Sequence, residues 1–146
     1  MMLRRVTTCA LLLFMASVVP VAAQTAADSA DIRAAALDYV EGWYTGDAAR
    51  MERAVHPELV KRIVATTPEG ESKLNGMTAA QLVEATRAGY GRRTPPVEQQ
   101  KDVVILDIFR NTAVVKTVMR DWIDYMQMAR WNGRWVIVNV LWLMLQ

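Results

Sequence analysis

The strongest constraint on the fold is a β-hairpin signal near the end of the chain, in the segment WIDYMQMARWNGRWVIVNVLW at residues 122–142. Two apolar runs flank Asn132-Gly133, a dipeptide that readily takes the positive φ angles of a type I′ turn. The segment carries four of the five tryptophans of the chain and very few charges. We therefore predict two long strands, 122–131 and 134–143, joined by a two-residue turn.

The rest of the chain predicts two further strands preceded by helices. The runs 103–109 and 113–119 are rich in β-branched residues, which indicates another hairpin. A first helix is expected from about 29 to 44, because Ile32, Ala36, Tyr39 and Trp43 recur at helical spacing. Four antiparallel strands and the helices before them give the class α+β.

Local signals place the other helices. Asp47 is suited to cap a second helix, and Thr78 with Gln81 forms a capping box for a third helix that ends at Gly89. His56 precedes Pro57, which disfavours helix at His56. We expect a short helical piece at 57–64 and a loop at 66–75. Three helices would thus precede the sheet.

The beginning of the chain predicts export. Arg4 and Arg5 precede an apolar run of about ten residues, followed by small residues up to Ala23, as in a secretory signal peptide. The expected organisation is a signal peptide at 1–23, cleaved near Ala23, and a single domain at 24–146, in a periplasmic or secreted protein. The run is too short for a stable membrane anchor, which needs roughly 20 residues.

Cleavage removes two arginines and no acid, which takes the net charge from +2 to zero. A neutral chain lacks the basic surface that nucleic-acid binding needs. Cleavage also removes Cys9, the one cysteine, and leaves His56 as the one histidine. We therefore predict no disulfide, no metal site, no catalytic triad and no bound cofactor.

The hairpin register can be extended from its turn. Pairing Trp131 with Arg134 and counting back sets Met126 opposite Asn139 and Asp124 opposite Leu141, and cross-strand partners share a face. Both faces of the hairpin are then largely apolar, unlike a sheet with one wet face. We expect helices on one face and, on the other, a second subunit or more of this chain. A homodimer through the sheet is the favoured reading, with Tyr125 and Trp142 in the contact.

Several of these motifs resemble one known family. The run 42–47 (GWYTGD), His56-Pro57, Asp124-Tyr125 and the run 132–139 (NGRWVIVN) are similar to the putative lumazine-binding family of the nuclear-transport-factor-2-like (NTF2-like) superfamily. The resemblance covers about residues 29–144. It implies a curved antiparallel sheet wrapped around helices as a cone with a pocket, short extra strands before Val103, and dimers through the sheet.

Asp124 and His56 are the candidate catalytic residues. A carboxylate on an apolar strand face is costly unless it is paired, and superfamily enzymes use an aspartate in the cone to move protons. The residues alone favour the other interpretation of Asp124, a structural carboxylate bonded to a helix backbone, a tyrosine or an arginine. His56 is a candidate base or a residue that closes the turn after its helix.

The candidate ligand-binding residues are Tyr39, Trp43, Asp124 and Asn139. The two aromatic side chains share a helix face and could floor a pocket, or belong to the core. Asn139 is expected near Asp124. The sequence favours a protein that binds a small, apolar or heteroaromatic molecule. The alternatives are a cofactor-free enzyme that transfers protons with Asp124, supported by Tyr39 or His56, and a pure dimerisation or assembly module.

Overall fold

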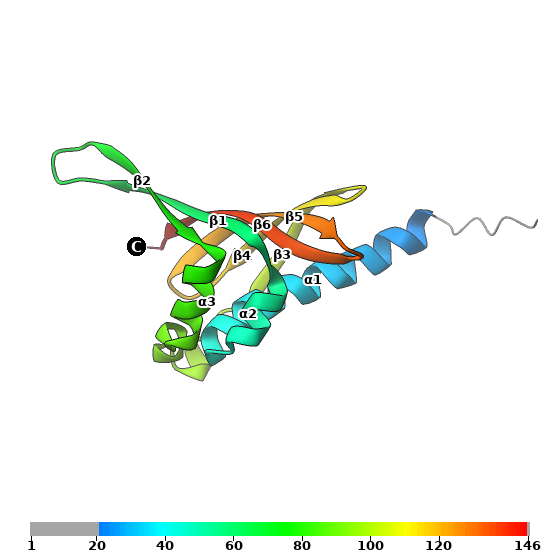
Figure 1. Ribbon diagram of the computed structural model, residues 1–146, viewed down its shortest axis with the longest axis horizontal. Coiled ribbons are helices and arrows are strands. Elements are labelled where there is room, and N and C mark those ends of the chain that lie inside the picture. Colours follow the sequence, from blue (N-terminus) through cyan, green and yellow to red (C-terminus); the bar gives the residue numbers. More distant parts are fainter. Residues whose placement is uncertain (1–20, 146) are drawn as a thin grey trace, which may run out of the picture.

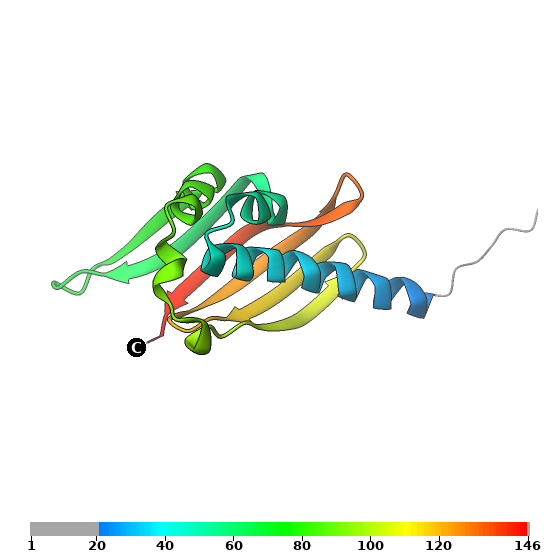
Figure 2. The same cartoon turned by 90° about the horizontal axis from the view of Figure 1, so that it is seen from below.

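Three helices cover one face of a six-stranded sheet in the computed structural model, which describes residues 21–145 (Figures 1 and 2). The helices are α1 (Val21–Thr45), α2 (Ala48–Ala54) and α3 (Ala79–Arg87), and two 3-10 turns, η1 (Tyr90–Arg93) and η2 (Pro96–Glu98), follow α3. The strands are β1 (Val55–Thr66), β2 (Ser72–Thr78), β3 (Asp102–Phe109), β4 (Thr112–Val118), β5 (Trp122–Trp131) and β6 (Arg134–Met144). The class is α+β.

The sheet is mixed, with the strand order β2-β1-β6-β5-β4-β3. All neighbouring strands are antiparallel except β1 and β6, which run parallel. The far ends of β1 and β2 project beyond the helices as a hairpin arm (Figure 1). Among residues 21–145, helices cover one face of the sheet and leave the other face open (Figure 1).

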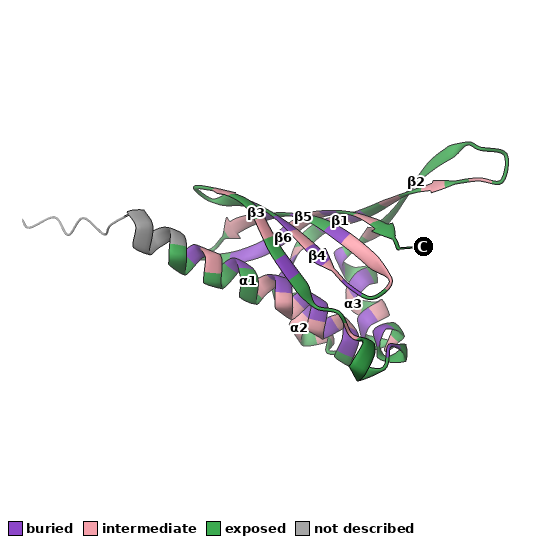
Figure 3. Cartoon of the chain, turned by 180° about the vertical axis from the view of Figure 1, so that it is seen from behind, coloured by how far each residue is buried: buried purple, intermediate pink, exposed green. Residues whose placement is uncertain are grey.

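Helix α1 crosses the helix-covered face diagonally (Figure 2). Ile32, Ala36, Tyr39 and Val40 are almost fully buried on its sheet side, which confirms the face predicted from their spacing. Its N-terminal part is held by Asp28, which forms an ion pair with Arg130 and accepts a hydrogen bond from the Trp135 indole at 3.3 Å. Figure 3 shows this layer of buried residues between helices and sheet.

The predicted helix caps are confirmed. The side chain of Asp47 accepts a hydrogen bond from the backbone N–H of Arg50 at 3.0 Å at the start of α2. Thr78 and Gln81 form the complete capping box at the start of α3. Each cap satisfies backbone N–H groups that have no partner within the first turn of a helix.

The prediction of a short helix at 57–64 is wrong, because these residues belong to β1. Their alternation buries Leu59 and Lys61 and exposes Glu58 and Arg62, which is the period of a strand. Pro57 lies between Val55 and Val60, where the pairing with β6 shifts register, so its missing N–H disrupts no ladder. The predicted loop at 66–75 likewise contains the start of β2, and α3 follows these two strands instead of preceding the sheet.

The predicted register of the last hairpin is correct near the turn and wrong beyond it. Trp131 pairs with Arg134, and Asn132 and Gly133 both have positive φ, as predicted. A bulge then shifts the register, so that Gln127 pairs with Asn139 and Asp124 pairs with Trp142. One extra residue in a strand moves all later side chains to the opposite face. The bulge therefore turns Trp142 toward the helices and Asn139 away from them.

The predicted signal peptide lies mostly outside the described residues, and only residues 21–23 of it form part of α1. Within 21–145, no helix combines the length and apolar character needed to cross a membrane.

Candidate functional site

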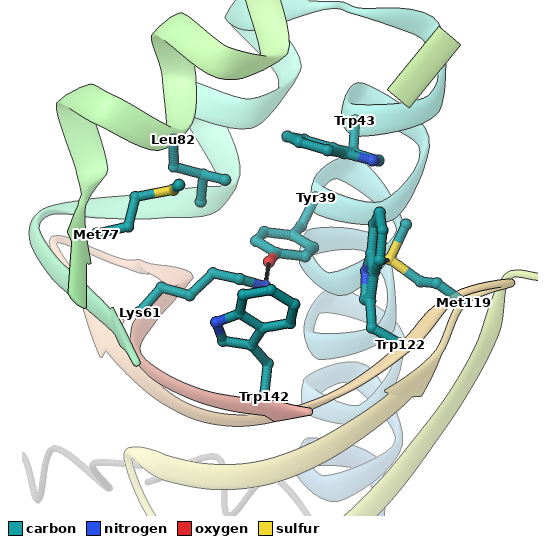
Figure 4. A pocket seen from close by; sticks show the side chains of 8 residues that line it. All are labelled: Tyr39, Trp43, Lys61, Met77, Leu82, Met119, Trp122 and Trp142. Carbon is teal, nitrogen blue, oxygen red and sulfur yellow. Dashed lines mark hydrogen bonds between the residues drawn. The ribbon is translucent and has the colours of Figure 1, made fainter. Parts of the chain in front are cut away.

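A small cavity lies between the helices and the sheet, where α1, α3, β1 and the ends of β5 and β6 meet (Figure 4). Its volume is about 100 Å³. The lining is aromatic and thioether-rich, with one charged side chain: Tyr39, Trp43, Lys61, Met77, Leu82, Met119, Trp122 and Trp142. An apolar concavity with few polar groups is the usual make-up of a small-molecule site.

Lys61 reaches this cavity from β1. It pairs with Val140 of β6, and its side chain extends past this strand to Asp124 on β5. Two strand spacings are about 9–10 Å, so a long side chain is needed to bridge β1 and β5. The parallel pairing of β1 with β6 thus brings a lysine and an aspartate together that are 63 residues apart in the sequence.

The Lys61 ammonium is held by two oxygen atoms. It forms an ion pair with Asp124 Oδ1 and donates a hydrogen bond to the Tyr39 hydroxyl at 2.7 Å (Figure 4). It also lies 4.8 Å from the ring centre of Trp142 and 5.4 Å from that of Tyr39, within cation–π range. The side chain of Lys61 is 9% exposed and that of Asp124 is 0% exposed, so the two charges neutralise each other out of contact with water.

Burial shifts the pKa values of these groups in opposite directions. Loss of hydration lowers the pKa of the Lys61 ammonium, although the Asp124 carboxylate acts in the other direction. Burial raises the pKa of the Tyr39 hydroxyl well above its ordinary value, and the negative charge of Asp124 adds to this. Tyr39 therefore stays protonated at any physiological pH, as a neutral hydroxyl beside the ion pair.

Three tryptophans form one side of the cavity through edge-to-face contacts. The ring centres of Trp43 and Trp122 are 5.7 Å apart, and those of Trp122 and Trp142 are 6.3 Å apart. Gly91 of η1 packs on the first of these residues, since a Cβ at this glycine would lie 2.2 Å from the Trp43 carbonyl oxygen. The wall is thus fixed by close packing at one end and by ring contacts along its length.

Three buried polar atoms in this region have no hydrogen-bond partner within the described part of the chain: Trp43 Nε1, Thr117 Oγ1 and Asp124 Oδ2. Thr117 and Asp124 are cross-strand partners on β4 and β5, and Trp43 lines the cavity itself. Unsatisfied buried polar atoms are rare in folded proteins and call for a partner such as water or a ligand.

The structure brings together three of the residues expected at the site. Tyr39 and Trp43 line the cavity, and Asp124 lies beneath it as the partner of Lys61. Asn139 does not join them: the bulge places it beside Gln127, to which its side chain donates a hydrogen bond at 3.1 Å.

His56 also lies apart from the lining. Its Nδ1 accepts a hydrogen bond from the backbone N–H of Glu58 at 3.1 Å, and its ring packs edge-on against Trp131, with the ring centres 4.7 Å apart. These contacts fit the local, turn-closing role considered for His56 and give it no contact with the cavity.

Lys61 is the charged residue of the cavity that was not predicted from the sequence. The helix predicted at 57–64 gave no reason to expect a buried charge at Lys61. Read as a strand, the same residues place Lys61 on one face with Leu59 and Ile63, and a lysine among apolar neighbours is a signal of a buried charge that needs a partner. Trp142 was assigned to the outer face because the bulge was not foreseen.

Residues 21–145 contain no group of three or more His, Cys, Asp or Glu side chains arranged to hold a metal ion. The polar groups carried by the lining side chains are an ammonium, a phenol and indole N–H groups.

We expect the change Lys61→Met to destabilise the protein strongly, because it leaves the Asp124 carboxylate buried and unpaired. The expected loss is about 3–5 kcal/mol, measured by urea unfolding. The double variant Lys61→Met/Asp124→Asn should recover most of this loss. Lys73→Met, at an exposed position on β2, is the matched control and should change stability by less than about 0.5 kcal/mol. If the single and double variants lose the same amount of stability, the unpaired Asp124 carboxylate is not the cause of the destabilisation.

Comparison with known proteins agrees with this architecture. The sequence profile of the putative lumazine-binding family matches residues 27–143. An NTF2-like protein of unknown function from Shewanella baltica is 16% identical, with a TM-score of 0.63 over 83% of this chain and 96% of that one. An NTF2-like protein with a cystatin-like fold from Novosphingobium aromaticivorans is 14% identical, with a TM-score of 0.62 over 91% and 93%.

A third NTF2-like protein of unknown function, from Silicibacter pomeroyi, is 16% identical, with a TM-score of 0.58 over 83% of this chain and 98% of that one. Identities this low show a shared fold. No curated protein matches the chain. The family profile spans nearly all of the residues that form the helices, the sheet and the cavity, so the chain has the fold of NTF2-like proteins and belongs to the putative lumazine-binding family.

Proposed function

We propose that this protein binds a small, largely apolar or heteroaromatic molecule in the aromatic cavity. The observation that carries the proposal is a neutralised ion pair beside an aromatic-lined cavity: Lys61 is paired with Asp124, and the cavity volume is about 100 Å³. A pocket whose charges are already paired favours an uncharged, flat guest over an ion. In this proposal the sheet and helices form the cone implied by the family, with the cavity at its open end.

The cavity volume limits the guest. An apolar cavity of roughly 150 Å³ binds benzene, whereas sites for drug-sized ligands span roughly 300–1,000 Å³. At about 100 Å³, the cavity is smaller than the one that binds benzene, so a one-ring guest would extend into its open mouth. A two-ring ligand such as lumazine would need part of its surface in the mouth, beside the half-buried Trp43 and Trp142, or a shift of Met77.

A proton-transferring enzyme is the less favoured alternative. Asp124 is not among the residues that line the cavity, and its Oδ1 is occupied by Lys61. A general base must reach the proton that it removes, so a reaction would have to pass through Lys61 or Tyr39. The unpartnered Asp124 Oδ2 is the one feature in favour of this alternative.

To test binding, we would add toluene and lumazine separately and follow the indole N–H signals of Trp43, Trp122 and Trp142 by NMR. At least one probe should shift these signals. Met77→Trp should weaken the binding by about tenfold or more, because the larger side chain fills the cavity. Leu74→Trp, on the same strand but 63% exposed, should leave it unchanged. If neither probe shifts the three signals, the proposed function is wrong.

The open face of the sheet supports a second proposal, that two copies of the chain pair through it. Leu141, Leu143 and Tyr125 are 53%, 44% and 39% exposed on this face. Apolar residues in the middle of a sheet are usually covered, and a specific interface buries about 1,200–2,000 Å² in total. Pairing through this face leaves the cavity, on the opposite face, accessible in each copy.

For this dimer we expect sedimentation at micromolar concentration to give twice the monomer mass. Leu141→Asp should yield monomers, because it places a charge at the centre of the interface. Leu74→Asp, on the projecting arm, is the control and should stay dimeric. A native protein that sediments as a monomer at high concentration would exclude the interface.

We also propose that the protein is exported and cleaved near Ala23. Cleavage there would leave four residues before Asp28, the side chain that ties α1 to the sheet through Arg130. The domain would thus keep its N-terminal anchor. N-terminal sequencing of protein recovered outside the cytoplasm should start at or near Gln24, whereas a start at Met1 would refute export by this route.

A further inference from the structure

The cavity offers hydrogen-bond donors and lacks matching acceptors. A lysine ammonium has three N–H donors, and the described residues supply two oxygen partners for Lys61: Asp124 Oδ1 and the Tyr39 hydroxyl. The third N–H has no oxygen partner among residues 21–145, and the ammonium nitrogen lies over the Trp142 ring, 4.8 Å from its centre. A ring face is a weaker partner for an ammonium N–H than a carbonyl oxygen.

A second donor without a partner belongs to a residue of the cavity wall. Trp43 Nε1 is buried and has no acceptor within the described part of the chain, although the residue lines the cavity. Another lining indole, that of Trp122, already donates to Met119 Sδ at 3.0 Å. The remaining lining side chains from Met77 and Leu82 add apolar surface. A ligand would therefore have to supply the hydrogen-bond acceptor that Lys61 and Trp43 lack.

The charge balance narrows the class of acceptor. Lys61 and Asp124 cancel each other at 9% and 0% side-chain exposure. A carboxylate ligand would add an unpaired negative charge next to the buried Asp124, and like charges in a low-dielectric site repel strongly. A neutral carbonyl oxygen accepts the same N–H without changing the net charge.

We propose that the natural ligand is a neutral, ring-sized molecule that carries a carbonyl-type oxygen, and that this oxygen accepts the third N–H of Lys61. This inference rests on the proposed binding function and adds the chemical class of the ligand. The apolar walls select for a flat ring, and Lys61 fixes its orientation by the position of the oxygen. The molecule should bind with its oxygen toward the Lys61–Asp124 pair and its ring against Trp142.

A matched pair of probes tests the inference. Acetophenone and α-methylstyrene have the same shape, but the first carries a carbonyl oxygen where the second has a methylene group. We expect acetophenone to bind about tenfold more tightly or better, because a hydrogen bond from a charged donor is worth at least that factor. Benzoate, of similar size with a negative charge, should bind more weakly than acetophenone. Indole N–H shifts measured by NMR give all three affinities.

The double variant Lys61→Met/Asp124→Asn removes the donor and the charge together. It should bind acetophenone and α-methylstyrene equally, and its NMR spectrum shows directly whether it is folded. If it does not fold, the probe comparison on the unaltered protein still decides. Equal affinities of the two probes for the unaltered protein, or tightest binding of benzoate, would overturn the inference and leave the binding function standing. If none of the three probes binds, the proposed function itself fails.

Discussion

The buried pair of Lys61 and Asp124 is the interaction on which the site depends. Each charge is deprived of water, so each is tolerable only because the other is in contact with it. Such pairs often contribute less to stability than apolar residues of the same volume would. Because Lys61 also lines the cavity, the pair joins the middle of the sheet to the proposed site.

Two features of the sheet position the pair and the tryptophan beside it. The parallel pairing of β1 with β6 sets Lys61 next to Val140, and the bulge in the hairpin sets Trp142 next to Asp124. Without the extra residue at the bulge, Leu141 would point into the cavity and Trp142 would point outward. The same irregularity thus places Trp142 in the wall of the cavity and Leu141 on the opposite face of the sheet.

Much of the fold could be predicted from the sequence because its signals are local. Asn132-Gly133, the Thr78–Gln81 capping box and the Asp47 cap each depend on a few neighbouring residues, and all three are present in the structure. The position of β1 could not be inferred as easily, because His56-Pro57 resembles the end of a helix while the strand is stabilised by β6, far along the chain. A bulge is difficult to predict from a sequence, because it depends on how two strands pair.

The candidate site was predicted only in part for the same reason. Tyr39 and Trp43 follow from helical periodicity, and Asp124 from a carboxylate on an apolar strand. Asn139 was misplaced by the bulge, and Lys61 was overlooked because its strand was read as a helix. The partner of a buried charge is determined by tertiary structure. Lys61 and Asp124 are 63 residues apart in the sequence, and no local pattern connects them.

Direct observation of the Lys61 ammonium by NMR tests the account most directly. A buried ammonium held by Asp124 and Tyr39 exchanges its protons slowly, whereas exposed lysines exchange too fast to give a signal at neutral pH. The account predicts one slowly exchanging lysine ammonium that is lost in the Lys61→Met/Asp124→Asn variant and shifts when a neutral carbonyl ligand is added. A Lys61 ammonium that exchanges like those of surface lysines, or that does not respond when such a ligand binds in the cavity, would contradict it.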